Sequence, residues 1–266
     1  EPALFISASL DETGRYLFIV TNEGTSAKNE LFLADFGDAA HPDLGAPVRP
    51  LYTGHDAAYD PIGVVNGTLY LLTDREAPRR RIVAVPLATP DVAHWRTVVP
   101  QGETTIQSAD LVAGRLVVTT LEDVASAVRF YALSGTPQET VALPGLGTVG
   151  GVSGRFDRPE LFYSFTSPLV PGSIYRYDAS ARRSVPFAPA RLTFDPSRYE
   201  TTRVFYPSKD GTKVPMFITR RKGMPLDGTN PTMLYAYGGF DISTNPTFRP
   251  DVPAWLELGG IWATAT

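Results

Sequence analysis

Few residues of this chain have a type and spacing that could perform covalent chemistry. Serine hydrolases of the α/β class use a G-x-S-x-G motif, a tight turn between a strand and a helix that exposes the serine hydroxyl. The nearest match begins at Gly151, but Arg155 stands where the second glycine is required. We therefore interpret Ser153 as a turn residue and assign neither a nucleophile nor a catalytic base to the chain.

Thiol and metal chemistry have equally little support. The sequence contains no cysteine and three histidines, which are His41, His55 and His94. No two of them have the spacing of metal ligands, so we expect each at a surface or turn position. The sequence predicts no metal site and no cofactor, and the lack of cysteine leaves the cellular compartment open.

Composition and charge limit the classes of partner. The 266 residues carry a net charge of −4, and the basic clusters Arg79–Arg81 and Arg220–Lys222 are too short to follow a phosphate backbone. We therefore expect no nucleic-acid partner. No apolar run reaches the roughly 18 residues of a membrane-spanning helix, so we expect a soluble chain with no membrane partner.

An internal repeat organises most of the chain. Four strand-like segments have equivalent leucines, which are Leu17, Leu69, Leu116 and Leu161. These leucines are 52, 47 and 45 residues apart, and a second set of equivalent positions one strand later drifts in the same way. A period of about 45–50 residues with several strands per unit is typical of a β-propeller blade. We predict about four blades, and the repeat leaves a generic antiparallel β-sandwich open as the alternative.

Each predicted blade has an innermost strand, two central strands and an outer strand. The first central strands are predicted at Arg15–Val20, Thr68–Thr73, Arg115–Thr120 and Glu160–Phe165. The outer strands are predicted at Val48–Tyr52, Arg96–Val99, Thr140–Leu143 and Arg183–Phe187.

A different pattern follows the repeat. Val204–Ser208 and Lys213–Arg221, joined by an Asp-Gly turn, predict a β-hairpin. A buried strand is predicted at Thr232–Tyr237, a helix opened by its proline at Pro253–Leu258, and another strand at Ile261–Thr266. This order of elements indicates the start of an α/β sheet with βαβ connections.

Several ordered stretches carry a family resemblance. They are FYPSKDGTKVPMFI (Phe205–Ile218), LDGTNP (Leu226–Pro231) and LYAYGGF (Leu234–Phe240), with LDETGRYLFIV (Leu10–Val20) and FYSFTSPLVPGSIYRYD (Phe162–Asp178) upstream. The first three resemble the opening of the α/β-hydrolase domain of prolyl oligopeptidases, and the other two are similar to blades of that family. The resemblance implies a mainly β chain: residues 1–195 form about four blades of a seven-bladed propeller, and residues 196–266 form the first strands of the catalytic domain, ending before the nucleophile.

Four residues acquire possible roles through this resemblance. Tyr237 would donate its hydroxyl to the oxyanion of the tetrahedral intermediate, and Phe240 would line the pocket that accepts proline. Gly238 and Gly239 would allow a tight backbone path beside them. From the residues alone, Tyr237 is better explained as a strand aromatic that packs against its neighbours, and only the resemblance reverses this. Phe240 could equally be an ordinary loop residue, and the glycines could form a plain turn.

The resemblance also implies an activity for the whole protein. We expect a serine endopeptidase that cleaves short peptides after proline, with the propeller as a size filter, whereas the chain alone should be inactive. The alternative is a non-enzymatic β-propeller that binds other proteins. The expected partners are short proline-containing peptides and the missing remainder of the chain. The expected location is the cytoplasm, or the periplasm if a missing N-terminus carries a signal peptide.

Incomplete pairing of the sheets has a physical consequence. An open set of blades and a partial sheet should leave apolar segments such as Met233–Tyr237 and Ile261–Ala265 uncovered. Uncovered apolar edges promote association. We therefore expect the isolated segment not to be a stable monomer.

Overall fold

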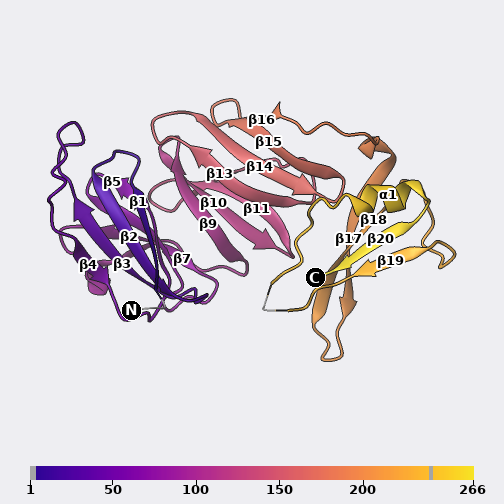
Figure 1. Cartoon of the computed structure of the whole chain (residues 1–266), viewed down its shortest axis with the longest axis horizontal. Helices are drawn as coiled ribbons and strands as arrows, with labels where there is room; N and C mark the ends of the chain where they lie inside the picture. The colour runs from indigo at the N-terminus through magenta and orange to yellow at the C-terminus, as the bar shows by residue number, and fades with distance from the viewer. Residues whose placement is uncertain (1–3, 240–241) are drawn as a thin grey trace. The chain divides into compact units, whose positions relative to one another are not determined.

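The computed structural model describes residues 4–239 and 242–266, and these residues form a mostly β structure (Figure 1). They make two compact units. The first takes in the chain as far as Thr120, together with Arg129–Glu139 and Arg155–Arg158. The second takes in Leu121–Val128, Thr140–Gly154 and the chain from Pro159 onward.

Four sheets of four strands follow the predicted repeat, with strand orders β1-β2-β3-β4, β5-β6-β7-β8, β12-β11-β10-β9 and β13-β14-β15-β16. The first two contain β1 (Leu4–Leu10), β2 (Tyr16–Glu23), β3 (Asn29–Asp35), β4 (Arg49–Tyr52), β5 (Tyr59–Val65), β6 (Thr68–Thr73), β7 (Arg81–Pro86) and β8 (Arg96–Val99), with the 3₁₀-helix η1 (Val92–His94) before β8. The next two contain β9 (Thr105–Val112), β10 (Arg115–Glu122), β11 (Ala125–Tyr131), β12 (Pro137–Thr140), β13 (Thr148–Gly154), β14 (Glu160–Ser167), β15 (Val170–Asp178) and β16 (Arg183–Ala188). Consecutive strands are neighbours in every sheet, as in propeller blades, and the predicted mainly β propeller fold is confirmed.

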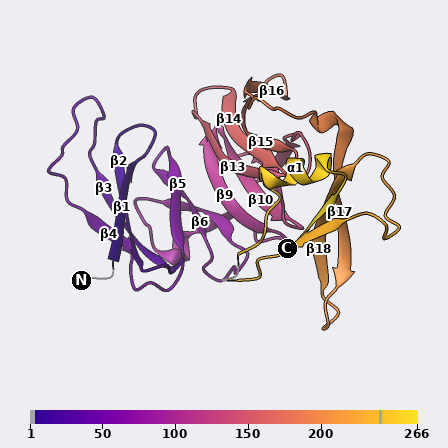
Figure 2. The ribbon, with the colours of Figure 1, turned by 45° about the vertical axis from the view of Figure 1, so that its right-hand side comes forward.

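The second blade shows why a blade needs neighbours. Side chains alternate across a strand, so one face of β6 and β7 presents Leu71 and Val83 to the core of the first blade. The opposite face presents Leu72 and Ile82 to a cluster that includes Leu116 of β10. Figure 2 shows β5 and β6 beside the first sheet. The central strands of this blade are therefore buried on both faces.

The second unit contains the fourth blade and a C-terminal sheet. In β14 every second residue is buried, and Tyr163 stacks on Tyr175 with ring centroids 5.4 Å apart. The C-terminal sheet has the strand order β17-β18-β20-β19. Its elements are η2 (Pro196–Arg198), β17 (Tyr199–Pro207), β18 (Lys213–Arg221), β19 (Thr232–Tyr235), the α-helix α1 (Asp251–Glu257) and β20 (Ile261–Ala265).

The C-terminal sheet combines a hairpin with a parallel pair. Strands β17 and β18 are antiparallel, and β19 and β20 are parallel and joined through α1. The helix packs Val252 and Leu256 in one cluster with Trp262 of β20 and Tyr199 of β17. The predicted hairpin and βαβ connection are therefore both present.

Several predicted elements of this sheet have different bounds. The first hairpin strand, predicted at Val204–Ser208, is β17 (Tyr199–Pro207) and begins five residues earlier, because it pairs with β18 along its whole length. The strand predicted at Thr232–Tyr237 ends at Tyr235, because its last parallel partner on β20 is Thr264. Its apolar run is typical of a buried strand, but Leu234 is 62% exposed, in agreement with the expectation that Met233–Tyr237 is uncovered in this chain. The helix predicted from Pro253 begins at Asp251, which places the proline in the first turn, where a backbone N–H has no intrahelical acceptor.

Two further expectations change with the packing. The outer strand of the third blade is at Pro137–Thr140, not Thr140–Leu143. The segment Ile261–Ala265 was expected to be uncovered, but Ile261, Trp262 and Ala263 are buried, and α1 packs on Trp262. Met233 and Tyr237 are exposed as expected, at 42% and 53%.

Candidate functional site

Tyr237 lies two residues beyond β19, at the start of a long connection to α1, and its side chain is half exposed. Gly238 has a φ of +64°, a left-handed conformation that glycine adopts without steric cost. A Cβ atom on Gly239 would lie 3.4 Å from Cε1 of Tyr237. The two glycines therefore allow the backbone to turn tightly beside the tyrosine ring. Phe240 lies outside the described residues.

A cavity of about 360 Å³ adjoins Tyr237 within the second unit. Its wall includes Phe217, Tyr235, Asn245, Arg249 and Trp262. The side-chain oxygen Oδ1 of Asn245 is buried and has no hydrogen-bond partner among the described residues. A cavity with aromatic walls could bind a short peptide, because its rings accept apolar side chains.

Arg249 fixes the far end of the connection between β19 and α1. Its guanidinium lies 4.4 Å from the ring centroid of Tyr235 and 5.3 Å from that of Trp262, within the range of cation–π attraction. Arg249 also forms two hydrogen bonds with Asp251, Nε to Oδ1 at 3.1 Å and Nη2 to Oδ2 at 2.7 Å. This contact lowers the pKa of the Asp251 carboxyl below its usual value.

The same connection is hydrogen-bonded to the fourth blade. The Oγ1 atom of Thr148 in β13 donates to the carbonyl oxygen of Pro246 at 3.1 Å. The backbone N–H of Phe248 donates to Oγ1 of Thr166 in β14 at 3.0 Å. The ring of Phe248 also stacks on Phe194, with centroids 6.4 Å apart. These contacts join segments far apart in the sequence, so the sequence pattern offered no signal for them.

Ser153 is a strand residue, which corrects its interpretation as a turn residue. It lies in β13 and is the register partner of Phe162 in β14, because the Gly151–Gly154 segment pairs regularly with its neighbour. The histidines lie as expected. His41 and His94 are exposed, and His55 lies in a turn with a φ of +50° and its Nδ1 atom 3.6 Å from Glu30 Oε1.

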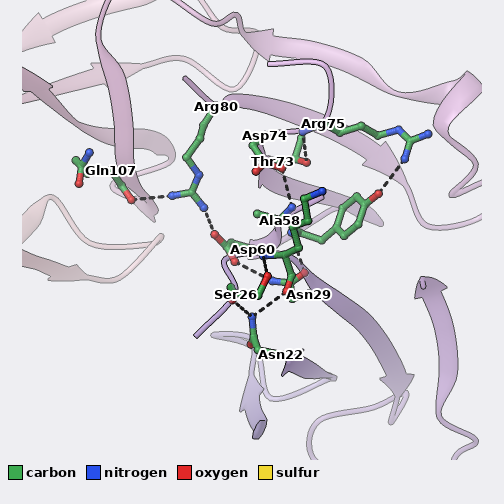
Figure 3. A network of polar contacts seen from close by, with 12 residues as sticks. Asn22, Ser26, Asn29, Ala58, Asp60, Thr73, Asp74, Arg75, Arg80 and Gln107 are labelled. Carbon is green, nitrogen blue, oxygen red and sulfur yellow. Dashed lines mark hydrogen bonds and ion pairs between the residues drawn. The ribbon is translucent and has the colours of Figure 1, made fainter. Parts of the chain in front are cut away.

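A second polar cluster joins three sheets within the first unit (Figure 3). Asp60 of β5 accepts a hydrogen bond from Asn29 Nδ2 at 3.3 Å and pairs with Arg80. Arg80 also donates to the carbonyl oxygen of Gln107 in β9 at 3.0 Å. Asp60 and Arg80 both belong to the second blade, so the contacts with the neighbouring blades are made through the amide of Asn29 and the carbonyl oxygen of Gln107. The basic cluster Arg79–Arg81 was the only sequence signal for it.

The described residues contain neither a cluster of metal ligands nor a helix that could span a membrane. Across residues 4–239 and 242–266, no three histidine, aspartate or glutamate side chains converge as ligands for a metal ion. Over the same residues, no helix has both the length and the apolar character needed to span a bilayer.

A family model and individual relatives both place this chain among the prolyl oligopeptidases. Residues 1–189 match the model of the prolyl oligopeptidase N-terminal β-propeller domain. The prolyl endopeptidase of Elizabethkingia meningoseptica is 33% identical over 262 residues, which are 98% of this chain and 36% of that protein. The chain thus spans little more than a third of the length of this relative.

Solved structures agree with this result. A prolyl endopeptidase structure that is 35% identical superposes with a TM-score of 0.85, covering 100% of this chain and 38% of that one. Prolyl oligopeptidase B from Galerina marginata, solved with a 25-residue macrocyclization substrate bound, is 27% identical with a TM-score of 0.86, covering 100% of this chain and 37% of that one.

Proposed function

The chain belongs to the prolyl oligopeptidase family, and we propose that the full-length protein containing it is a serine peptidase that cleaves short peptides on the carboxyl side of proline. The observation that carries this proposal is the similarity to a prolyl endopeptidase along 98% of the chain. A relative whose structure holds a bound peptide substrate supports peptides as the class of partner.

In this proposal the two parts of the chain have separate tasks. Residues 1–195 contribute blades of a propeller that limits the size of the peptides admitted. Residues 196–266 open the catalytic domain, so the chain alone is inactive and depends on the remainder of the protein. The cytoplasm is the proposed location, or the periplasm if the full-length protein carries a signal peptide.

Tyr237 is the proposed oxyanion donor. Its position supports this role, because it adjoins a cavity at the end of a strand, with two glycines allowing close backbone approach. A phenol held in place before the reaction stabilises the developing oxyanion by a hydrogen bond. Phe240 is proposed to stack on the substrate proline, and Gly238 and Gly239 to shape the backbone beside it.

Removal of one hydroxyl tests the assignment. In the full-length protein, Tyr237→Phe should lower kcat for a proline-containing peptide by about 10²–10³-fold, the usual effect of losing an oxyanion donor. The matched control is Tyr206→Phe, which removes a hydroxyl on β17 outside the cavity and should leave kcat unchanged. Equal kcat for Y237F and the wild type, with both proteins folded, would disprove the role of Tyr237.

The reading frame beyond Thr266 separates the peptidase from a non-enzymatic propeller. A G-x-S-x-G motif followed by an aspartate and then a histidine would support the peptidase. A stop codon directly after this position would support the binding protein instead.

A further inference from the structure

The connection between β19 and α1 contains the proposed oxyanion donor near its start and a second, well-held segment near its end. We call residues 242–250 the post-tyrosine loop. Ile242 N–H donates to the carbonyl oxygen of Gly239 at 3.1 Å, so this loop is joined directly to the Tyr237–Gly239 turn. At the other end, Arg249 stacks on Tyr235, two residues before Tyr237. The position of the loop and that of Tyr237 are therefore coupled at both ends.

The fourth blade supplies hydrogen bonds to the middle of this loop. The Thr166 hydroxyl donates to the carbonyl oxygen of Val170 at 3.1 Å, which leaves its oxygen lone pairs to accept from Phe248 N–H. Thr148 donates to the carbonyl oxygen of Pro246, a buried residue. Each hydroxyl thus satisfies a backbone group of the loop that has no strand or helix partner.

The hairpin turn of the fourth blade adds an apolar contact. Pro168, in the turn between β14 and β15, lines the cavity that Tyr237 also lines. Its neighbour Leu169 packs against the cluster formed by α1 and β20. The end of one blade therefore holds the loop by two hydroxyl groups, and its hairpin turn packs beside the cavity and the helix that follows the loop.

We propose that Thr148 and Thr166 are positioning residues for catalysis: by fixing the post-tyrosine loop, the fourth propeller blade sets the place of the Tyr237 hydroxyl. This inference rests on the proposed function of Tyr237. An irregular connection of this length is mobile unless its backbone groups are bonded. A displacement of about 1 Å in a catalytic group can lower a rate by about 10²-fold, so modest loosening of the loop would be measurable.

The first test measures turnover in the full-length protein. Thr166→Val keeps the shape of the side chain and removes both hydrogen bonds, and we expect kcat to fall about fivefold to tenfold with little change in KM. Thr166→Ser retains the hydroxyl and should restore kcat. The matched control is Thr201→Val, because among the described residues the Thr201 hydroxyl bonds Thr219 of the β17–β18 hairpin, at 3.0 Å, and no residue of the loop.

A double-mutant cycle distinguishes positioning from general stability. If Thr166 acts through the Tyr237 hydroxyl, T166V should have no further effect on kcat once Tyr237 is phenylalanine. An equal loss of kcat in both backgrounds would overturn the proposal. If Y237F alone leaves kcat unchanged, the oxyanion assignment fails, and the loop contacts are then judged by hydrogen exchange.

Hydrogen exchange measures the mobility of the post-tyrosine loop directly and does not depend on catalytic activity. The hydrogen-bonded amides of Ile242, Asn245 and Phe248 should exchange about fivefold to tenfold faster in T166V than in the wild type, and T201V should leave them unchanged. Unchanged exchange of these amides in T166V would overturn the claim that the fourth blade holds the loop, whether or not the peptidase assignment stands.

Discussion

The second blade and the C-terminal sheet bury comparable apolar strands to very different extents. In the second blade, Leu71 and Val83 are buried because neighbouring blades cover both faces of the sheet. In the C-terminal sheet, Trp262 of β20 is buried under α1, whereas Leu234 on the adjacent strand β19 is 62% exposed. Since both strands are apolar, the difference depends on the elements that cover them. Apolar content alone therefore does not determine burial in this chain.

The largest expected effect on stability comes from replacing one leucine in each of the two regions. Leu71→Ala should lower the free energy of unfolding by about 2–5 kcal/mol, because it leaves a cavity in a fully packed cluster. In the 266-residue chain itself, Leu234→Ala should change it by less than about 0.5 kcal/mol, because the side chain is mostly exposed there. Urea denaturation of both variants measures the difference, and equal losses would contradict it.

Asp110 of β9 is a carboxyl group in a blade whose other inward side chains are mainly apolar. Its titration tests how strongly the blades exclude water. Burial raises the pKa of this carboxyl to about 6. A folded-state pKa above the unfolded value means that the ionised form destabilises the fold, and that this penalty disappears as the pH falls from about 6 to 4. Asp110→Asn should therefore add about 2–3 kcal/mol at pH 8 and almost nothing at pH 4. Denaturation curves at both pH values measure this gain; a pH-independent difference would rule out the explanation.

The tight turn before β20 tests packing within the C-terminal sheet. A Cβ on Gly260 would overlap Nε1 of Trp255, whose indole donates to the carbonyl oxygen of Ile261 at 3.0 Å. We expect Gly260→Ala to cost about 1–3 kcal/mol by overpacking. Gly259→Ala meets no neighbouring atom but has a φ of +89°, so it should cost about 1 kcal/mol. Thermal unfolding should rank the two variants in this order.

The smallest expected effect is that of exposed ion pairs, which should contribute equally little to stability in a blade and near the C-terminal sheet. Arg15–Asp35 in the first blade and Arg249–Asp251 in the C-terminal unit are both exposed ion pairs. Double-mutant cycles should give coupling energies of about 0.2–1 kcal/mol for each, reduced in 1 M salt. A coupling several times larger in either region would show that its charges are less accessible to solvent than their exposure suggests.

The central strands of the blades could be predicted from sequence because local pattern determines them. The leucines Leu17, Leu69, Leu116 and Leu161 recur at blade spacing, and all four lie in the second strand of a four-stranded sheet. The predicted position of the outer strand β12 is three residues too far along the chain. An outer strand has a neighbour on one side only, and its bounds are fixed by this pairing and not by its composition.

The candidate site was only partly predictable. Tyr237, Gly238 and Gly239 were found through a family resemblance, and their roles stay predictions. Asn245 and Arg249 gave no signal, because a buried amide and a stacked guanidinium depend on long-range packing. The contacts of Thr148 and Thr166 with the post-tyrosine loop join residues 98 and 82 positions apart, which no local pattern encodes.

The connection between the third and fourth strands shortens from blade to blade. It occupies residues 36–48 in the first blade, then 87–95, 132–136 and 179–182 in the next three. The repeat therefore loses length at a surface loop while its strands keep their order. Because exposed loops tolerate added residues, and Leu44 is 78% exposed, the first of these loops is a suitable place to insert an affinity tag or a fluorescent reporter, far along the chain from the segment that carries Tyr237.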